Sequence, residues 1–392
     1  MRFAVFHLLL AAFLVWRAVL PLDARRGVKA LLSLLILAAA SFSFWTAVCF
    51  GGLLSPELPR SVLIAGNALE AFVVFLALIA LLREAVIFIT VMLGRMGERA
   101  HRAVQKDRRA LLGMAAASAA LAGSGMYEGI RTPDVRDREI PIPDLPQALE
   151  GFTFVQLSDL HASALLTEPF MKATVERVNA LNPDLILITG DLADGTVERR
   201  WRDAAPLGAL KARFGVFGCD GNHEHYGDYE KWRRRWDELG IRMLRNECVV
   251  LEGLGESGRG RIALAGVCDP RALQFGREGP DAAKAFGKAP PEREALRILM
   301  AHQPKYFPAY REAVPFALQL SGHTHGGQLL GMDEWVARMN GGYVCGLYDG
   351  PHGAKLYVHP GTGLWNGFPL RLGVSSEIAR IRLVSASPLK VS

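Results

Sequence analysis

Five short groups of polar residues recur in the C-terminal part of the chain, each directly after an apolar run. In chain order they are Asp159-Leu-His161, Gly190-Asp191-Leu-Ala-Asp194, Gly221-Asn222-His223-Glu224, His302, and Gly322-His323-Thr-His325. Their carboxylate oxygens, imidazole nitrogens and amide oxygen are ligands of divalent transition metals such as Mn, Fe or Zn. The donors suffice for two ions with an aspartate between them. Two such ions lower the pKa of a bridging water and clamp a phosphoryl group for in-line attack.

Each group alone is a weak signal. A single His302 is more often a helix cap or a hydrogen-bonded core residue, and Gly221-Asn222 alone would indicate a hairpin turn. The group Gly322–His325 is stronger, because His-x-His at a strand end brings two imidazoles into one loop. All five groups in this order, each after an apolar run, argue against coincidence and favour one metal site.

The elements that must position these groups are short β-like runs with helices between them. The runs are Phe152–Leu157, Leu185–Thr189, Gly215–Gly218, Leu296–Met300 and Phe316–Leu320. One helix is expected after Thr167, a suitable N-cap, with Phe170, Val175 and Val178 on an apolar stripe. The pattern predicts an α/β domain whose polar site lies at the strand ends.

The five groups together resemble the calcineurin-like metallophosphoesterase superfamily, over about residues 152–384. The resemblance implies a β-sandwich flanked by helices. Gly195 stands where the phosphoprotein phosphatases have an arginine, which disfavours that branch. Features further along the chain resemble the bacterial membrane-associated YkuE/YaeI-type branch, namely Gly322–Gln328, Gly361–Trp365 and Pro369-Leu-Arg371.

The resemblance also implies a role for each polar residue. Seven residues would hold two divalent ions: Asp159, His161 and His325 the first, Asn222, His302 and His323 the second, and Asp191 both. His223 would protonate the leaving oxygen or stabilise the transition state, and Asp194 would orient it. The expected activity is hydrolysis of a phosphate ester or anhydride by a hydroxide that bridges the two metals.

The N-terminal third of the chain is mostly apolar and precedes this domain with an expected all-α transmembrane region of about four helices. The predicted spans are Phe3–Leu20, Val28–Leu54, Val62–Leu82 and Leu111–Tyr127, with Ala85–Leu93 as an interfacial continuation of the third. Glu70 would lie within the membrane, either as a functional group or in a polar contact between helices.

Lysine and arginine in the short loops predict the orientation in a bacterial inner membrane. The first loop carries Arg25, Arg26 and Lys29, and the third is the basic stretch Arg95–Arg109. Both are therefore expected inside, which delivers the C-terminal domain to the periplasmic side, although the loss of one helix would reverse this. Arg108-Arg109 is either a twin-arginine export signal or the basic flank of the fourth helix.

The composition of the chain indicates which kinds of binding partner to expect. The net charge of +6 comes largely from Arg95–Arg109 beside apolar segments, which favours membrane topology over nucleic-acid binding. The five cysteines have no CxxC spacing, which argues against a zinc ribbon. The expected partners are the lipid bilayer and a phosphorylated small-molecule or lipid substrate, and the sequence does not indicate an oligomeric state.

The predicted domains are a transmembrane region over residues 1–127, a linker over 128–150 and the metallophosphoesterase domain over 151–392. The linker is inferred from four prolines within Arg131–Glu150. The stretch from Asp269 to Pro291, rich in proline and glycine, is either a loop over the site or a disordered surface insertion.

The function expected first is a metal-dependent phosphohydrolase at the membrane surface. Outside the membrane, phospholipids, lipid-linked phosphates or envelope phosphodiesters are within reach. On the cytoplasmic side a nucleotide-linked lipid pyrophosphate becomes the alternative, because related enzymes cleave UDP-diacylglucosamine there. A metal-binding sensor or scaffold is the non-enzymatic alternative, and a full ligand set with His223 argues against it.

Overall fold

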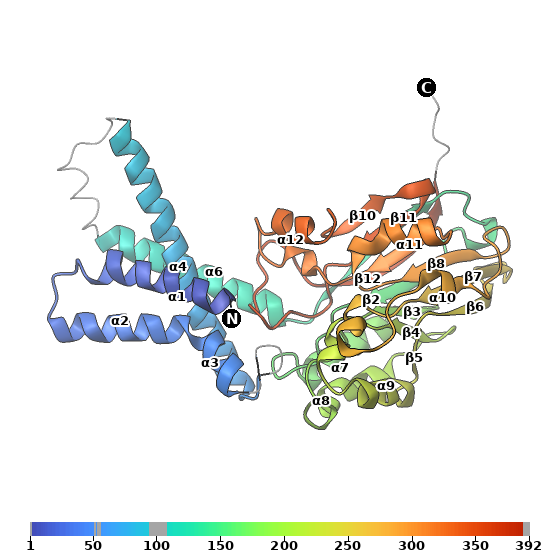
Figure 1. Ribbon diagram of the computed structural model, residues 1–392, viewed down its shortest axis with the longest axis horizontal. Coiled ribbons are helices and arrows are strands. Elements are labelled where there is room, and N and C mark those ends of the chain that lie inside the picture. Colours follow the sequence, from blue (N-terminus) through green and yellow to red (C-terminus); the bar gives the residue numbers. More distant parts are fainter. Residues whose placement is uncertain (1, 51, 53–55, 94–107, 387–392) are drawn as a thin grey trace. The chain divides into compact units, whose positions relative to one another are not determined.

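The computed structural model describes residues 2–50, 52, 56–93 and 108–386, and its contacts divide the chain into two compact units (Figure 1). One unit comprises Met1–Tyr127 together with Asn366–Leu370, and the other comprises Glu128–Trp365 and Arg371–Ser392. Most of the basic stretch Arg95–Arg109, on which the predicted orientation depends, lies outside the described residues. The predicted limits of the functional domains stay predictions.

The first unit is helical and differs from the expected row of four spans. Its helices are α1 (Arg2–Leu14) with a π-helical continuation η1 (Val15–Val19), α2 (Arg26–Ala40), α3 (Phe42–Cys49), α4 (Arg60–Met92) and α6 (Arg108–Ile130). Among the described residues, only Arg60–Met92 and Arg109–Ile130 are each long and apolar enough to cross a membrane. The predicted second span is two helices bent by 54°, which count as a third span only if taken together.

The expected first span is also shorter than predicted. Its apolar helical part covers Val5–Val19, and at 1.5 Å per residue this falls short of a hydrocarbon core about 30 Å thick. Among the described residues the candidate spans number two, or three with the bent pair, so the number of about four spans stays a prediction. Hydropathy alone could not detect the bend at Ser41, because the residues on both sides of it are equally apolar.

Helix α4 runs without a break through Arg83 and Glu84, where the sequence predicted the end of the third span. Arg17 forms an ion pair with Glu84, which lowers the cost of both charges among apolar helices. Residues 85–92 are thus part of α4 rather than a separate interfacial continuation.

Glu70 of α4 accepts hydrogen bonds from the backbone N–H and hydroxyl of Ser43, at 3.1 and 2.7 Å, and lies 2.9 Å from His7. These contacts match the interpretation of Glu70 as a polar contact between helices.

The second unit is a sandwich of two six-stranded sheets, which confirms the expected α/β fold. The strand orders are β1-β12-β2-β3-β4-β5 and β10-β11-β9-β8-β7-β6. The strands that matter for the site are β2 (Thr153–Leu157), β3 (Ile186–Thr189), β4 (Val216–Cys219), β8 (Leu296–Met300) and β9 (Leu318–Ser321). These five strands coincide, within two residues at each end, with the five apolar runs in the sequence.

Strand β8 shows how the layers of the sandwich are built. Successive side chains of a strand point to opposite faces. Ile298 and Met300 pack into the core between the two sheets, where they meet Leu187 of the first sheet. Leu299 faces the other way, into a second cluster with Phe286 and Phe307. The helices α10 (Ala282–Phe286) and α11 (Phe307–Ala313) thus cover the outer face of the second sheet.

The remaining helices and strands complete this frame. The helices are α7 (Glu168–Asn179), α8 (Val197–Ala204), α9 (Tyr229–Glu238) and α12 (Asp333–Met339). The remaining strands are β5 (Ile241–Met243), β6 (Glu247–Leu254), β7 (Gly260–Gly266), β10 (Gly346–Asp349) and β11 (Lys355–Val358). Helix α7 begins after Thr167 as expected, although the Thr167 side chain makes no capping hydrogen bond.

The predicted linker contains a strand of the sheet. Strand β1 (Asp134–Ile142) pairs in parallel with β12 (Glu377–Ser385) over its whole length. Ile140 and Ile142 alternate into the core, and β1 lies at the edge of its sheet, where Pro141 is tolerated. One of the four prolines that suggested a linker therefore lies in an edge strand, and the other three flank it.

The stretch from Asp269 to Pro291 is also structured, so its interpretation as a disordered insertion is wrong. It contains the 3-10 helix η5 (Pro270–Phe275) and helix α10. Asp269 and Asp281 cap these two elements through hydrogen bonds from Arg271 N and Lys284 N. Phe286 anchors the stretch in the second core cluster.

Candidate metal centre

The five polar groups meet because the strands before them are parallel neighbours. Strands β2, β3 and β4 are adjacent and parallel in the first sheet, and β8 and β9 are so in the second. The carboxyl ends of parallel neighbours lie at the same edge, where α/β folds build their sites. Eight of the nine predicted site residues fall into three groups whose donor atoms lie within 4.8 Å of one another. The ninth, Asn222, directly precedes His223.

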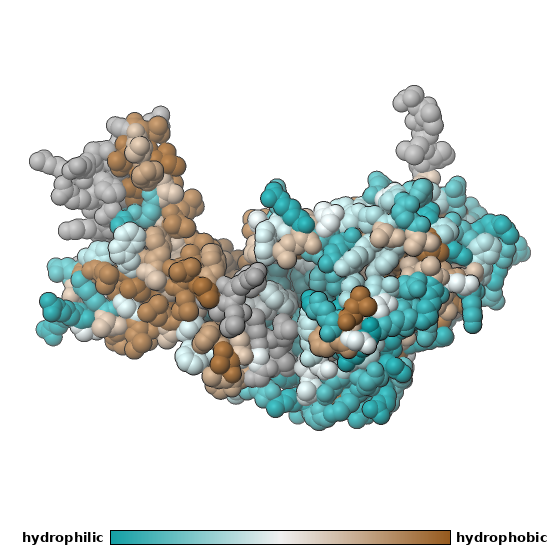
Figure 2. Space-filling model, in the orientation of Figure 1, coloured by the Kyte–Doolittle hydropathy of each residue, from teal (hydrophilic) through white to brown (hydrophobic). Residues whose placement is uncertain are grey.

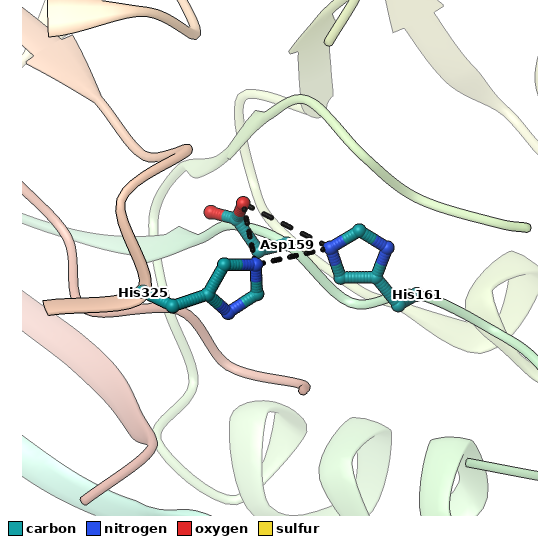
Figure 3. Close-up of side chains that lie close together, drawn as sticks. All are labelled: Asp159, His161 and His325. Carbon is teal, nitrogen blue, oxygen red and sulfur yellow. Dashed lines mark hydrogen bonds and ion pairs between the residues drawn. The ribbon is translucent and has the colours of Figure 1, made fainter. Parts of the chain in front are cut away.

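The first group consists of Asp159, His161 and His325, whose side chains point toward one another (Figure 3). The Nε2 atoms of His161 and His325 are 3.2 Å apart, and His325 Nε2 lies 3.3 Å from Asp159 Oδ1. All three side chains are buried. Two imidazole nitrogens and a carboxylate oxygen that converge away from water could hold a divalent cation.

The second group consists of Asp191, His302 and His323. His302 Nε2 lies 3.2 Å from Asp191 Oδ2, and His302 Nδ1 is 2.7 Å from the carbonyl oxygen of Thr189. Because a carbonyl only accepts, Nδ1 carries the proton and donates to it. The lone pair of Nε2 is therefore available to a metal, an arrangement typical of metal-binding histidines.

Asp191 lies between the two groups. Its Oδ2 is 3.2 Å from His302 Nε2 in one group and 3.7 Å from His161 Nε2 in the other, and its Oδ1 accepts the backbone N–H of His223 at 2.8 Å. Burial alone would raise the pKa of Asp191, but the neighbouring histidines, His302 and His223 foremost, hold it well below its ordinary value. This carboxylate is thus ionised and placed to serve both groups.

Asp194 contacts two histidines rather than the single one expected. Its Oδ1 lies 3.0 Å from His161 Nδ1 and 2.5 Å from His223 Nδ1. An ionised carboxylate can only accept hydrogen bonds, so the rings of His161 and His223 both carry a proton on Nδ1. Their Nε2 atoms therefore point toward the other ligands of the candidate metal centre. Burial opposes charge on His223, yet the carboxylates of Asp191 and Asp194 raise its pKa. A raised pKa favours the protonated imidazole that a proton donor requires.

The chain reaches these positions through an unusual backbone conformation. Five predicted ligands have a positive φ, between 46° and 73°: Asp159, His161, Asp191, His323 and His325. Aspartate and histidine tolerate this left-handed region better than most residues, but it still costs free energy. Such outliers persist where the surrounding structure holds them, commonly at functional sites.

Glycines in the motifs allow the loops to approach closely. A Cβ on Gly221 would lie 2.2 Å from Asp191 Oδ1, and one on Gly322 would lie 1.9 Å from Ser158 Oγ and 2.3 Å from Asp159 Oδ2. Real Cβ atoms do not come so near to other heavy atoms. Both positions therefore require glycine if the carboxylates of Asp159 and Asp191 are to stay in place.

The donor set fits a pair of divalent ions. Asn222 Oδ1 and His302 Nε2 are buried and make no hydrogen bond with any described residue. Buried polar atoms normally have partners, and a cation would satisfy both of these. The mixture of imidazole, carboxylate and amide donors suits Mn, Fe or Zn.

Comparisons with known proteins identify the family. The model of the calcineurin-like phosphoesterase family matches residues 152–327, a range that contains all nine predicted site residues. A protein from Bos taurus named "Transmembrane protein with metallophosphoesterase domain" is 33% identical over 359 residues, covering 89% of this chain and 79% of its own. This chain is a member of the calcineurin-like metallophosphoesterase superfamily.

Two further relatives refine this assignment. The Danio rerio protein with the same name is 37% identical over 273 residues, which cover 69% of this chain and 61% of its own, less than two thirds of its length. "Uncharacterized metallophosphoesterase YkuE" of Bacillus subtilis is 29% identical over 289 residues, covering 71% of this chain and 96% of its own. The expected likeness to the YkuE-type branch of the superfamily is confirmed.

Two buried residues of this metallophosphoesterase hold the loops of the candidate metal centre in place. The sequence did not predict a role for either of them. Glu224 accepts hydrogen bonds from the backbone N–H groups of Gly221, Asp191 and Leu192, at 2.6, 3.0 and 2.7 Å. It thereby joins the loops that follow β3 and β4. Its place in the Gly-Asn-His-Glu group was visible in the sequence, but its backbone partners were not.

Arg371 is the second of these residues. Its guanidinium is fully buried and donates to the carbonyl oxygens of Pro360 and Gly363, at 2.9 and 2.7 Å, and to that of His325 at 3.4 Å. Arg371 thus fixes the loop behind His325. The sequence pointed to it only as part of the branch likeness Pro369-Leu-Arg371.

Proposed function

We propose that this protein is a membrane-anchored phosphoesterase that uses two divalent metal ions, Mn, Fe or Zn, to hydrolyse a phosphate ester or anhydride of a lipid or envelope substrate. The observation that carries the proposal is the position of Asp191. Its Oδ2 lies within 3.7 Å of a histidine nitrogen from each of the two ligand groups. A shared carboxylate of this kind suits a dinuclear site better than two independent ones.

Each residue then has one task. The first ion would be held by Asp159, His161 and His325, the second by Asn222, His302 and His323, and Asp191 would contact both. When bound, such a pair lowers the pKa of a shared water and offsets the charge of the phosphoryl group. Six of the seven ligands are buried, all but His323, and the low local dielectric strengthens these electrostatic effects.

His223 would supply the proton for the leaving group. With Nδ1 held by Asp194, its Nε2 lies on the inner side, 3.9 Å from Asp191 Oδ2. When the bond from phosphorus to the leaving oxygen breaks, that oxygen takes the Nε2 proton and departs as an alcohol. A general acid of this kind typically contributes 10²–10⁴-fold in rate.

Membrane anchoring is supported by the candidate spans Arg60–Met92 and Arg109–Ile130. The relatives from Bos taurus and Danio rerio are named as transmembrane proteins. With all four predicted spans in the membrane, the basic residues of the first and third loops favour a catalytic domain on the periplasmic side of a bacterial inner membrane. On that side phospholipids and other envelope phosphodiesters are the available substrates.

The test uses the full-length protein in detergent with bis(p-nitrophenyl) phosphate and added Mn. We expect metal-dependent hydrolysis that Asp191→Asn reduces by at least about 10³-fold together with metal content, because the shared ligand and its charge are lost. Asp237→Asn on the exposed surface of α9 is the matched control and should behave as the unchanged protein. A protein that carries both metals yet hydrolyses no phosphate ester would be a sensor or scaffold, and the proposal would fail.

A further inference from the structure

The segment between β7 and α10 presents large apolar side chains to solvent. Leu273 and Phe275 of η5 (Pro270–Phe275) are 64% and 47% exposed. Figure 2 shows a brown patch on the otherwise mostly teal and white surface of the second unit, over the yellow-orange segment before α10 in Figure 1. Exposed apolar side chains grouped in this way often mark a binding surface.

A row of aromatic rings connects this patch to the predicted proton donor. The ring of Tyr226 meets the His223 ring edge-on at 5.3 Å between centroids, and it meets the Phe275 ring edge-on at 6.3 Å. The Arg271 guanidinium lies over the Tyr226 ring at 5.4 Å. Tyr226 is itself 42% exposed, so the row leads from the buried imidazole outward to solvent.

The segment is firmly attached to the centre. Buried Asp269 at its start accepts hydrogen bonds from the Gln303 side chain, at 3.0 Å to each carboxylate oxygen. Gln303 directly follows His302. Farther along the segment, the guanidinium of Arg277 lies over the ring of Tyr229 in α9, 4.4 Å from its centre. A fixed segment that exposes Leu273 and Phe275 has the preorganisation that a binding surface needs.

The position of the patch indicates what it binds. In the proposed reaction His223 gives its proton to the leaving oxygen, so the group attached to that oxygen lies on the His223 side of the centre. From there outward come Tyr226, Phe275 and Leu273, which form an apolar path. An alcohol with a long alkyl chain would cover these side chains as it extends away from phosphorus.

We infer that Tyr226, Leu273 and Phe275 form the leaving-group subsite, and that the substrate is a phosphate ester whose leaving alcohol carries a long alkyl chain. This inference rests on the proposed phosphoesterase activity. On this inference the three side chains determine the specificity of the enzyme for the length of the alkyl chain. The metal ligands and His223 perform the same chemistry on any ester.

The test compares the hydrolysis of butyl and decyl phosphate esters. Each alkyl chain is tested as a monoalkyl phosphate and as a methyl alkyl phosphate. All concentrations stay below those at which the esters form micelles. The two alkanols have nearly the same pKa, so the ratio of their kcat/KM values reports on contact with the chain alone. Bis(p-nitrophenyl) phosphate measures the basic activity. We expect the full-length protein to prefer the decyl ester by at least about tenfold, since added methylenes in an apolar site gain affinity.

Leu273→Ser and Phe275→Ser should each lower this ratio several-fold, and together by roughly tenfold, with much less effect on the butyl ester. Val250→Ser removes a comparably exposed apolar side chain from β6 and should leave the ratio unchanged. An unchanged ratio in the double variant, with nitrophenyl hydrolysis intact, overturns the subsite and leaves the phosphoesterase standing. No hydrolysis of any ester by metal-loaded protein overturns both.

A further experiment places the decyl ester in vesicles of phosphatidylethanolamine and phosphatidylglycerol. If the double variant loses activity only there and keeps its chain-length ratio on monomeric esters, the patch contacts the membrane surface and the subsite is wrong. If the ratio on monomeric esters falls, the patch contacts the substrate itself, and the inference holds.

Discussion

At the scale of single residues, His223 and His161 share one partner, Asp194, whose Oδ1 lies 2.5 Å from Nδ1 of His223 and 3.0 Å from Nδ1 of His161. We propose different roles for the two rings. His161 would bind a metal, and His223 would donate the proton to the leaving oxygen.

His223→Ala should therefore keep both metals and lose activity according to the leaving group. On alkyl esters we expect a loss of 10²–10⁴-fold, and on a nitrophenyl ester a smaller loss, because a more acidic leaving group needs less help from an acid. Metal analysis and rates on two esters of different leaving-group pKa test this. His352→Ala, at an exposed histidine, is the matched control. Loss of a metal with equal losses on both esters would make His223 a ligand.

Asp194→Asn should affect both of its histidine partners. An amide can still contact one ring, but it no longer favours Nδ1–H on His161 and His223 together. Loss of such a supporting partner typically costs 10–100-fold in metal affinity or activity. We expect weaker binding of one metal in titrations, in addition to a milder form of the His223→Ala effect. Unchanged affinity for both metals would show that Asp194 acts on His223 alone.

The acidity of His161 predicts how metal binding depends on pH. Burial would lower the pKa of this imidazole, but Asp194, Asp191 and Asp159 together raise it to about 9 in the metal-free protein. Protonated imidazole cannot bind a metal, so the ion must displace a proton at every pH below about 9. Asp191 also raises the pKa of His302 well above its ordinary value, so the affinity for Mn should rise between neutrality and pH 9 by up to about tenfold per pH unit for each ligand proton that the metal displaces. Titration calorimetry in buffers of different ionisation enthalpy would detect the released proton, and an affinity independent of pH would contradict the assignment.

At the scale of elements, the turns after the strands matter as much as the ligands. Gly221→Ala would place a Cβ 2.2 Å from Asp191 Oδ1, so the carboxylate or the loop has to move. We expect a loss of most activity and of one metal, with the cooperative unfolding transition retained. Gly123→Ala in α6, where a Cβ meets no other atom within 4 Å, is the matched control. Full metal content and activity in Gly221→Ala would contradict the close approach.

The sequence predicted the strands of the site well and their neighbours less well. Apolar runs that end in polar groups located β2, β3, β4, β8 and β9, because strand burial and strand-end chemistry both leave local patterns. Strand β1 was mistaken for a linker, since its partner β12 is far along the chain and only pairing reveals it. The positive φ of Asp159 and the second contact of Asp194 likewise arise only when separate loops meet.

At the scale of the whole molecule, the side of the membrane remains a prediction that depends on the number of spans. A reporter that works only in the periplasm, fused after Ser392, should be active, and one that works only in the cytoplasm should not. A fusion after Arg25, between η1 and α2, should show the opposite pattern. A cytoplasmic signal at Ser392 would redirect the search to nucleotide-linked lipids.

The pairing of β1 with β12 also governs the order in which this protein is completed. Arg138 of β1 pairs with Glu377 of β12, which lies 239 residues later in the chain. As synthesis proceeds from the N-terminus, β1 leaves the ribosome long before β12 exists. Contacts of such long sequence separation form slowly, because the loop between them must first be ordered. Until then β2 lacks a neighbour on that side, and the first sheet is open at the edge next to Asp159. We therefore expect the metal centre to reach its final form only after β12 has been translated.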